Sequence, residues 1–200
     1  MIYNYHMFSE KHNKNLLKES IKNRTVTVFP KHYSNFPDKW DYFINFIDFG
    51  SQQPMPKSRQ EEMEEGDDNS QFRKGLVAFW GYMTILIDRP QEGFFPGLEE
   101  IKSDLVSTFN KEPSGSLAII SLSSSEKKVE RHEDDTDNVY TQCVGSVTWR
   151  IYVGDSKEYT DYELNPGDVI FVPSGTSHEV FPNTPRSAIV FVFKKEDDIG

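Results

Sequence analysis

A series of short β-type segments in the C-terminal part of the chain constrains the fold most. From residue 117 onward the sequence reads LAIISL, VYTQCV, VTWRIYV, DVIFV and AIVFVF, separated by turn-rich pieces such as VGDSKE and NPGD. β-Branched and aromatic residues favour pleated strands, and short strands at such spacing are typical of antiparallel sandwiches and barrels rather than of parallel βαβ units. The sequence therefore predicts a mainly β fold.

The region before these strands predicts helices and loops. Apolar spacing predicts a short helix within residues 1–24 and amphipathic helices within 35–50 and 98–110. The segment TVTVF at 25–29 has the composition of a strand and is followed by a proline, which ends it.

Composition indicates how these parts are arranged. We expect an N-terminal helical and loop extension over residues 1–114, packed on a β-barrel formed by residues 115–200. Within the extension, residues 51–74 carry early prolines and a central acidic cluster. Such a segment is either a solvated surface loop or a mobile lid over the barrel, and composition alone does not separate the two.

Charge and cysteine content limit the partners and the cellular compartment that we expect for this protein. Twenty-two Lys and Arg against 32 Asp and Glu give a net charge of −10 with no basic stripe, which argues against nucleic-acid binding. No apolar run reaches the roughly 20 residues of a membrane span, and the N-terminus lacks signal-peptide character, so we expect a cytoplasmic protein without membrane association. The single cysteine, Cys143, fits a reducing compartment and a buried packing role.

The stretch RHEDDTDNVYTQCVG, residues 131–145, places polar side chains at even steps. On a single strand, side chains at even spacing point to one face, so an imidazole, a carboxylate, an amide, a phenol and a second amide would look into one cavity. These residues are His132, Asp134, Asn138, Tyr140 and Gln142. The alternation also predicts that Arg131 and Glu133 point outward.

A second histidine, His178, follows the run PGDVIFVPSGTS far downstream. With His132 and Asp134 it completes a set of two imidazoles and one carboxylate, the ligand set of non-heme iron(II) oxygenases. Three protein ligands leave positions of an octahedral ion free for a bidentate oxo-acid and oxygen. The sequence therefore predicts that these three residues bind a metal and are the catalytic residues. Asp135 would break the spacing and stays a candidate for supporting the ligands.

The spacing of these residues resembles the two signature motifs of the cupin superfamily. The first motif runs H-x-H, three or four residues, E, six residues, G, and the chain has His132, x, Asp134, three residues, Asn138, six residues, Gly145. The second motif runs G, five residues, P-x-G, two residues, H, and GDVIFVPSGTSH matches it in full. The resemblance implies that residues 115–200 form a double-stranded β-helix, the cupin or jelly-roll barrel.

The two changed positions point to a narrower group. Asp134 in place of the second histidine and Asn138 in place of the glutamate give a His-x-Asp…His triad, which resembles the JmjC-like iron(II)- and 2-oxoglutarate-dependent oxygenases. The run HEDDTDNVYTQCVGSVTWRIY is similar to the ribosomal oxygenases and asparaginyl hydroxylases. The resemblance implies Fe(II) at the triad, 2-oxoglutarate as cosubstrate, and Asn138 beside that cosubstrate.

One departure concerns the cosubstrate anchor. The families that the chain resembles usually place a lysine two residues after the motif glycine to pair with the distal carboxylate of 2-oxoglutarate, and this chain has Val147 there. A buried carboxylate needs a cation. The available substitute is Arg186, close to where the similar prolyl-hydroxylase branch uses an arginine. We therefore predict cofactor binding by Asn138, Arg186, Tyr140 and Gln142, the last two either lining the pocket or filling the barrel interior.

We expect the other aromatic and histidine residues singled out in the sequence to have structural and not catalytic roles. Trp149 and Tyr152 are expected to pack the barrel. His6, His12 and His32 have no partner at ligand spacing and are expected on the surface.

The leading functional hypothesis is an iron(II)- and 2-oxoglutarate-dependent oxygenase that hydroxylates a protein side chain or a small molecule. The alternative, motivated by Val147, is a metal-binding cupin that does not use 2-oxoglutarate: another dioxygenase, an isomerase or a small-ligand binding protein. A metal-free structural or interaction module is the third hypothesis. Homodimers are common in the families that the chain resembles, so we expect a homodimer.

Overall fold

The computed structural model describes residues 11–34, 84–88, 98–121, 129–154 and 156–194. Strands dominate these residues, together with two helices, α1 (Lys11–Asn23) and α5 (Leu98–Phe109). The strands are β1 (Thr27–Phe29), β2 (Thr84–Asp88), β3 (Gly115–Ser121), β4 (Val129–His132), β5 (Asp137–Val144), β6 (Val147–Tyr152), β7 (Tyr159–Leu164), β8 (Val169–Val172), β9 (His178–Pro182) and β10 (Arg186–Phe193).

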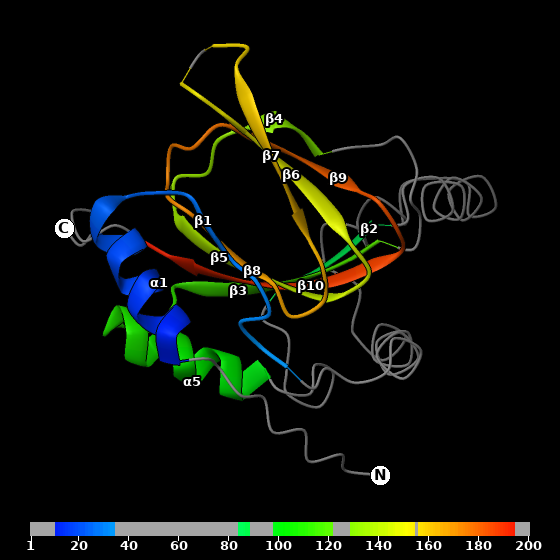
Figure 1. Cartoon of the computed structure of the whole chain (residues 1–200). Coiled ribbons are helices and arrows are strands. Elements are labelled where there is room, and N and C mark those ends of the chain that lie inside the picture. The colour runs from blue at the N-terminus through cyan, green and yellow to red at the C-terminus, as the bar shows by residue number, and fades with distance from the viewer. Residues whose placement is uncertain (1–10, 35–83, 89–97, 122–128, 155, 195–200) are drawn as a thin grey trace, which may run out of the picture.

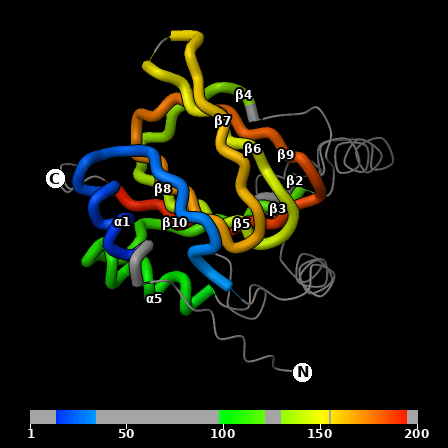
Figure 2. The backbone as a smooth tube through the Cα atoms, viewed as in Figure 1, coloured from blue at the N-terminus to red at the C-terminus, as the bar shows by residue number. Residues whose placement is uncertain are grey.

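The strands form two antiparallel sheets that face each other (Figures 1 and 2). One sheet has the strand order β1-β8-β5-β10-β3-β2, and the other has the order β4-β9-β6-β7. Within the described residues every strand pairing is antiparallel. The predicted mainly β fold of the jelly-roll or cupin type, a double-stranded β-helix with helices before it, is thus confirmed.

Strand β5 separates two apolar cores because its alternate side chains point to opposite faces of the sheet. Tyr140 lies in the core between the two sheets, together with Trp149 and Ile170. Val139 and Cys143 lie in the outer core, between the six-stranded sheet and the helices. The predicted alternation is correct for this strand, and Cys143 is buried as expected.

The two helices pack beside the six-stranded sheet on its outer face (Figure 1). Leu17 of α1 and both Ile101 and Leu105 of α5 are completely buried in the outer core. Leu17 and Ile21 in α1, like Ile101 and Leu105 in α5, are one turn apart on one helical face, which explains why an apolar periodicity in the sequence predicted both helices. Neither described helix is long and apolar enough to cross a membrane.

A buried polar cluster joins the helices to the segment after β1. Asp104 of α5 accepts a hydrogen bond from the Tyr33 hydroxyl at 3.1 Å, forms an ion pair with Lys14 of α1, and lies 3.5 Å from His32 Nε2. His32 is completely buried, so its predicted surface position is wrong. Its ring packs edge-on against Phe29 and Tyr33, and spacing along the sequence does not reveal such contacts.

A second correction concerns Tyr152. It lies on the outer face of the four-stranded sheet, where its hydroxyl donates to Glu179 at 2.7 Å, and does not pack the barrel interior. Trp149 and Ile151 occupy the inner face of β6, and alternation then places Tyr152 outside. The assignment of Trp149 to barrel packing is confirmed.

Other expectations concern the N-terminal part of the chain. The predicted helix within 35–50, the acidic segment 51–74 and His6 lie outside the described residues. Strands β1 and β2, both from the predicted extension, pair with β8 and β3 of the large sheet. The division of the chain at residue 114 stays a prediction.

A turn glycine fixes how the N-terminal segment approaches the barrel. Gly167 has φ of +93°, and a Cβ atom there would lie 2.3 Å from the carbonyl oxygen of Tyr33. Its own carbonyl accepts the N–H of Tyr33 at 3.0 Å. A larger residue would be strained and would displace this segment, which explains the glycine.

Candidate metal centre

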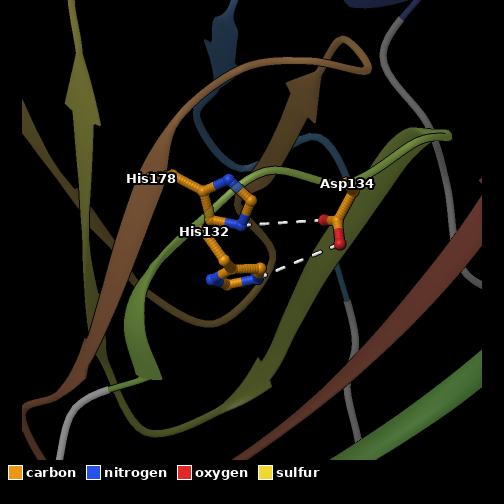
Figure 3. Close-up of side chains that lie close together, drawn as sticks. All are labelled: His132, Asp134 and His178. Carbon is orange, nitrogen blue, oxygen red and sulfur yellow. Dashed lines mark ion pairs between the residues drawn. The ribbon is translucent and has the colours of Figure 1, made fainter. Parts of the chain in front are cut away.

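Three side chains able to bind a metal converge between β4, β9 and the connection from β4 to β5 (Figure 3). His132 is the last residue of β4, His178 is the first of β9, and Asp134 lies in the connection. His132 Nε2 is 3.9 Å from Asp134 Oδ1, and His178 Nε2 is 3.7 Å from Asp134 Oδ2. One donor atom from each residue lies within 4.8 Å of the other two, so the structure brings the predicted triad together.

The triad is assembled from two strands and a bend, which corrects the expected single strand through residues 132–142. β4 belongs to the four-stranded sheet and β5 to the six-stranded sheet. The bend between them falls in the acidic run EDDT, whose aspartates favour turns over regular strand. His132 and His178 are direct cross-strand partners in β4 and β9, and their ring centroids are 4.3 Å apart.

Backbone carbonyls orient both imidazoles in the same way. His132 Nδ1 lies 2.7 Å from the carbonyl oxygen of Glu130, and His178 Nδ1 lies 2.9 Å from that of Thr176. A carbonyl only accepts, so each Nδ1 carries a hydrogen, and the neutral form of each ring has its lone pair on Nε2. This is the arrangement that supports metal-binding histidines, because the second ring nitrogen fixes the tautomer and the ring plane.

The surroundings of His178, the buried ligand, favour its neutral imidazole form. Burial lowers the pKa of His178; the Thr176 carbonyl opposes this effect, and the neighbouring His132 adds to the lowering. The net pKa lies below the usual value, so the ring is neutral at neutral pH and can donate its lone pair. Side-chain exposure is 2% for His178, 40% for His132 and 35% for Asp134, so the centre opens to solvent on one side.

These donors fit a divalent transition metal. Nitrogen and oxygen ligands bind such ions at about 2.1 Å, so two donors on one ion lie at most about 4.2 Å apart. The separations of 3.7 and 3.9 Å from Asp134 are within that limit. The three donor atoms of the triad, one from each residue, lie within 4.8 Å of one another, and small side-chain rotations would bring every pair within the limit. Two imidazoles and one carboxylate with an open side match the donor set of non-heme iron(II) centres.

Asn138 contacts the carboxylate of the triad. Its Nδ2 donates to Asp134 Oδ2 at 2.5 Å, and its Oδ1 accepts from the Thr136 hydroxyl at 3.1 Å. The amide therefore fixes the rotation of the Asp134 carboxylate, a role that supports a metal ligand. The sequence placed Asn138 beside a cosubstrate, and that role stays a prediction.

A hydrogen-bonded chain occupies the barrel interior beside the triad. Arg186 Nη1 donates to the Tyr140 hydroxyl, which donates to Gln142 Oε1 at 2.8 Å. Gln142 Nε2 in turn donates to the carbonyl oxygens of Val144 at 2.7 Å and Gly145 at 3.0 Å. Tyr140 and Gln142 are both completely buried, so they fill the interior and hold the arginine.

Arg186 itself is a buried charge. Its exposure is 1%, no carboxylate pairs with it among the described residues, and its Nε has no hydrogen-bond partner there. Val147, at the position where a lysine was expected from the resemblance, is completely buried in the apolar core between the sheets. Arg186 is thus the cation that the barrel interior offers to an anion.

Trp149 connects the arginine network to the metal centre. Its ring stacks on His178 with centroids 5.0 Å apart and packs edge-on against Tyr140 at 5.1 Å. A continuous path of contacts therefore runs from Arg186 through Tyr140 and Trp149 to His178. The three predicted ligands and three of the four predicted cofactor residues lie along or beside this path.

Sequence reasoning missed the residues that brace the ligands from outside. Arg131, predicted to point outward, is exposed as expected, but its Nε donates to Ser177 Oγ at 2.7 Å. This bond joins the residues that directly precede His132 and His178. The signal in the sequence for this contact was that each of the two residues directly precedes a ligand. Strand alternation alone predicts only the direction of their side chains and gives them no role.

Comparisons with known proteins add to this geometry. No family model matches the sequence, and no curated protein matches it. The X-ray structure of Escherichia coli ycfD matches over 98% of this chain and 56% of that chain, with a TM-score of 0.55 and 13% identity. The chain has a cupin/JmjC-like fold. A structure of YcfD, a ribosomal oxygenase, with cobalt and 2-oxoglutarate matches over 97% of this chain and 54% of that chain, with a TM-score of 0.52 and 16% identity.

The cupin/JmjC-like fold is what these comparisons establish. The chain spans about half the length of the YcfD chains, and the identities are too low to carry function with the fold. A cupin superfamily protein from Desulfitobacterium hafniense also matches over 56% of this chain, with a TM-score of 0.38 and 12% identity.

Proposed function

We propose that the chain is an iron(II)- and 2-oxoglutarate-dependent oxygenase. The observation that carries this proposal is the placement of a buried Arg186, which lacks a carboxylate partner among the described residues, in the same barrel interior as a His, Asp and His triad. A divalent ion and a dicarboxylate would complement these two features together. A neutral ligand would leave the arginine uncompensated.

His132, Asp134 and His178 would hold the iron through two Nε2 atoms and one carboxylate. When bound, the iron would supply the redox chemistry that couples oxidative decarboxylation of 2-oxoglutarate to succinate and carbon dioxide with hydroxylation of a substrate by oxygen. The protein's contribution is the open coordination side, the fixed tautomers of both histidines, and the orientation of Asp134 by Asn138.

Arg186 would bind the distal carboxylate of 2-oxoglutarate. A guanidinium presents its donors in a planar fork that matches a carboxylate, and a charge-assisted pair in a buried site is strong. Burial raises the pKa of Tyr140 to about 12, although Arg186 acts in the opposite direction. Tyr140 therefore stays protonated at neutral pH, accepts from Arg186, donates to Gln142, and keeps the guanidinium in place.

The direct test is succinate formation from 2-oxoglutarate with Fe(II) and oxygen. We expect turnover in the wild-type chain and none in Asp134→Ala, which removes the only carboxylate of the triad. Full metal occupancy without succinate, in the presence of candidate substrates, would count against the proposal. The two substrate classes to assay are protein side chains and small molecules, and the name ribosomal oxygenase that YcfD carries makes ribosomal components the first candidates.

A second candidate function is a metal-binding cupin that does not use 2-oxoglutarate. The observation that favours it is Val147, which places an apolar side chain where the families that the chain resembles carry the cosubstrate lysine. Calorimetry separates the candidates. If Arg186 is the anchor, Arg186→Met should weaken 2-oxoglutarate binding at least tenfold, because a buried charge-assisted pair contributes on the order of 2 kcal/mol or more. Unchanged affinity would remove Arg186 as the anchor, and no binding of 2-oxoglutarate to the metal-loaded wild-type chain would favour the second candidate.

Three further proposals concern the setting of the protein: a homodimer, a cytoplasmic location, and no nucleic-acid partner. Support for the last comes from the net charge of −10. Light scattering after size-exclusion chromatography measures the oligomeric state, and a monomer at all concentrations would contradict the first.

A further inference from the structure

We infer that Arg24 and Asp137 are positioning residues for the metal centre, through the turn that joins β8 to β9. This inference rests on the proposed metal site and extends it to the end of helix α1. Neither residue belongs to the triad or to the arginine network, and Asp137 occupies a position that the first motif leaves unspecified. Their contacts nevertheless converge on the backbone that carries Asp134 and His178.

Arg24 reaches the barrel from the C-terminal end of α1. It has a left-handed backbone conformation, with φ of +54°, and directly follows the last residue of the helix. Its Nη1 donates to Asp137 Oδ2 at 2.5 Å, and its Nη2 donates to Ser174 Oγ at 2.9 Å. One guanidinium thus holds the start of β5 and the turn after β8. Figure 1 shows α1 ending next to that turn.

Asp137 is the buried centre of this brace. Its second oxygen, Oδ1, accepts the backbone N–H of Ser174 at 2.9 Å. The side chain of Asp137 is 7% exposed, whereas that of Arg24 is 39% exposed. A carboxylate this buried requires both its donors, so the guanidinium and the Ser174 N–H fix its place and are fixed by it. Asp137 lies three residues after Asp134, at the other end of the bend.

The turn held by this brace contacts two ligands of the triad directly. The N–H of Gly175 donates to the carbonyl oxygen of Asp134 at 2.8 Å, and the carbonyl oxygen of Thr176 accepts from His178 Nδ1 at 2.9 Å. Gly175 has φ of +74°, a conformation that glycine adopts without strain. A shift of this turn would therefore move the backbone of one ligand and the ring of another. The brace contacts neither donor atom.

The test compares the full-length variants Arg24→Ala and Arg150→Ala with the wild-type chain. Arg150 makes two hydrogen bonds to Asp161, at 2.8 and 2.9 Å, on the outer face of the four-stranded sheet, so its loss is a matched control for removing a paired arginine. We expect Arg24→Ala to raise the Kd for Co(II) about tenfold, the effect typical of residues that orient metal ligands. We expect Arg150→Ala to change that Kd by less than about twofold.

Two further measurements report the position of the turn and of the metal ligands, and not the overall folding of the chain. Amide hydrogen exchange of Gly175 in the metal-free protein should be faster in Arg24→Ala and unchanged in Arg150→Ala. The Co(II) absorption spectrum should shift in Arg24→Ala at full occupancy. Asp137→Asn serves as a second variant if Arg24→Ala does not fold. It keeps an oxygen for Ser174 but can turn an amide N–H toward Arg24, and we expect the same direction of change.

The outcomes separate this inference from the proposed function. Wild-type affinity for Co(II) in both Arg24→Ala and Asp137→Asn, or a loss no larger than in Arg150→Ala, overturns the positioning role and leaves the metal site standing. Failure of the wild-type chain to bind Co(II) overturns the proposed function and this inference with it.

Discussion

At the scale of single residues, the barrel interior is notable for a charge in an apolar setting. Arg186 begins β10 and is among the largest fully buried side chains described. Its described partner is the neutral Tyr140 hydroxyl. A protein interior tolerates such a charge when hydrogen bonds satisfy its donors and an anion balances it. The sequence predicted a role for this residue because the resemblance implied a cation for the cosubstrate and the chain lacks the usual lysine, but it could not show the tyrosine and glutamine that hold the arginine.

The Tyr140 hydroxyl should matter for stability because it joins two buried groups. Tyr140→Phe leaves Arg186 Nη1 and Gln142 Oε1 without the bonds observed here, and leaving buried polar groups unpaired costs about 2 kcal/mol. Urea unfolding at neutral pH measures this loss in the free energy of unfolding. Tyr152→Phe, which removes a hydroxyl from the outer sheet face, is the matched control and should lose less. Equal losses in the two variants would mean that the buried network adds nothing specific.

At the scale of elements, strands rich in β-branched and aromatic residues were predicted from sequence, and three strands with more polar sequences were missed. β8 and β10 are buried on both faces and read as apolar runs. β7, with the sequence YTDYEL, is mostly exposed, and the short β4 and β9 mix charged residues with apolar ones. Local composition could not identify them, because cross-strand pairing and not apolar content forms these strands. The ligands His132 and His178 lie in two of these missed strands.

The contact between α1 and α5 should depend on the ionised form of Asp104. Burial raises the pKa of Asp104, but interactions with His32, Lys14 and Tyr33 outweigh this effect, and the net pKa lies below its usual value. A lowered folded-state pKa contributes stability above the unfolded value of about 3.9, and this contribution is lost as pH falls through the folded pKa. The stability difference between wild type and Asp104→Asn should therefore be largest near neutral pH.

Urea unfolding of both chains between pH 7 and pH 3 tests this expectation. The difference in free energy of unfolding should begin to shrink near pH 4 and continue to fall at lower pH. A difference that is constant across the whole range would contradict a role for the carboxylate charge.

At the scale of the whole molecule, the candidate site depends on how the chain crosses between the two sheets and how their strands pair. The bend at residues 133–136 carries the chain from one sheet to the other, and the pairing of β4 with β9 places two distant histidines side by side. The cupin motif spacing predicted this meeting only through resemblance to a family, since no local pattern specifies which strands pair. Helix α1 was predicted as a helix, but its link to the site through Arg24 depends on tertiary contacts between segments far apart in sequence.

Metal binding should stabilise the whole barrel because the ligands come from two strands and a bend. A ligand that binds only the folded state at 100 times its Kd adds about 2.7 kcal/mol. Thermal unfolding with Co(II) should therefore show a higher Tm than unfolding after chelation. The same comparison in Asp134→Ala should show no metal-dependent increase, and an increase as large as in wild type would place the metal elsewhere.

The binding of 2-oxoglutarate to the chain with and without Co(II), measured by calorimetry in the absence of oxygen, tests the central claim most directly. A triad that binds a metal beside a buried Arg186 predicts tight binding to the Co(II)-loaded chain and weak or no binding after chelation, with the tight phase lost in both Asp134→Ala and Arg186→Met. Binding of 2-oxoglutarate that is absent from the metal-loaded chain, or that is equally strong without metal, would contradict the account.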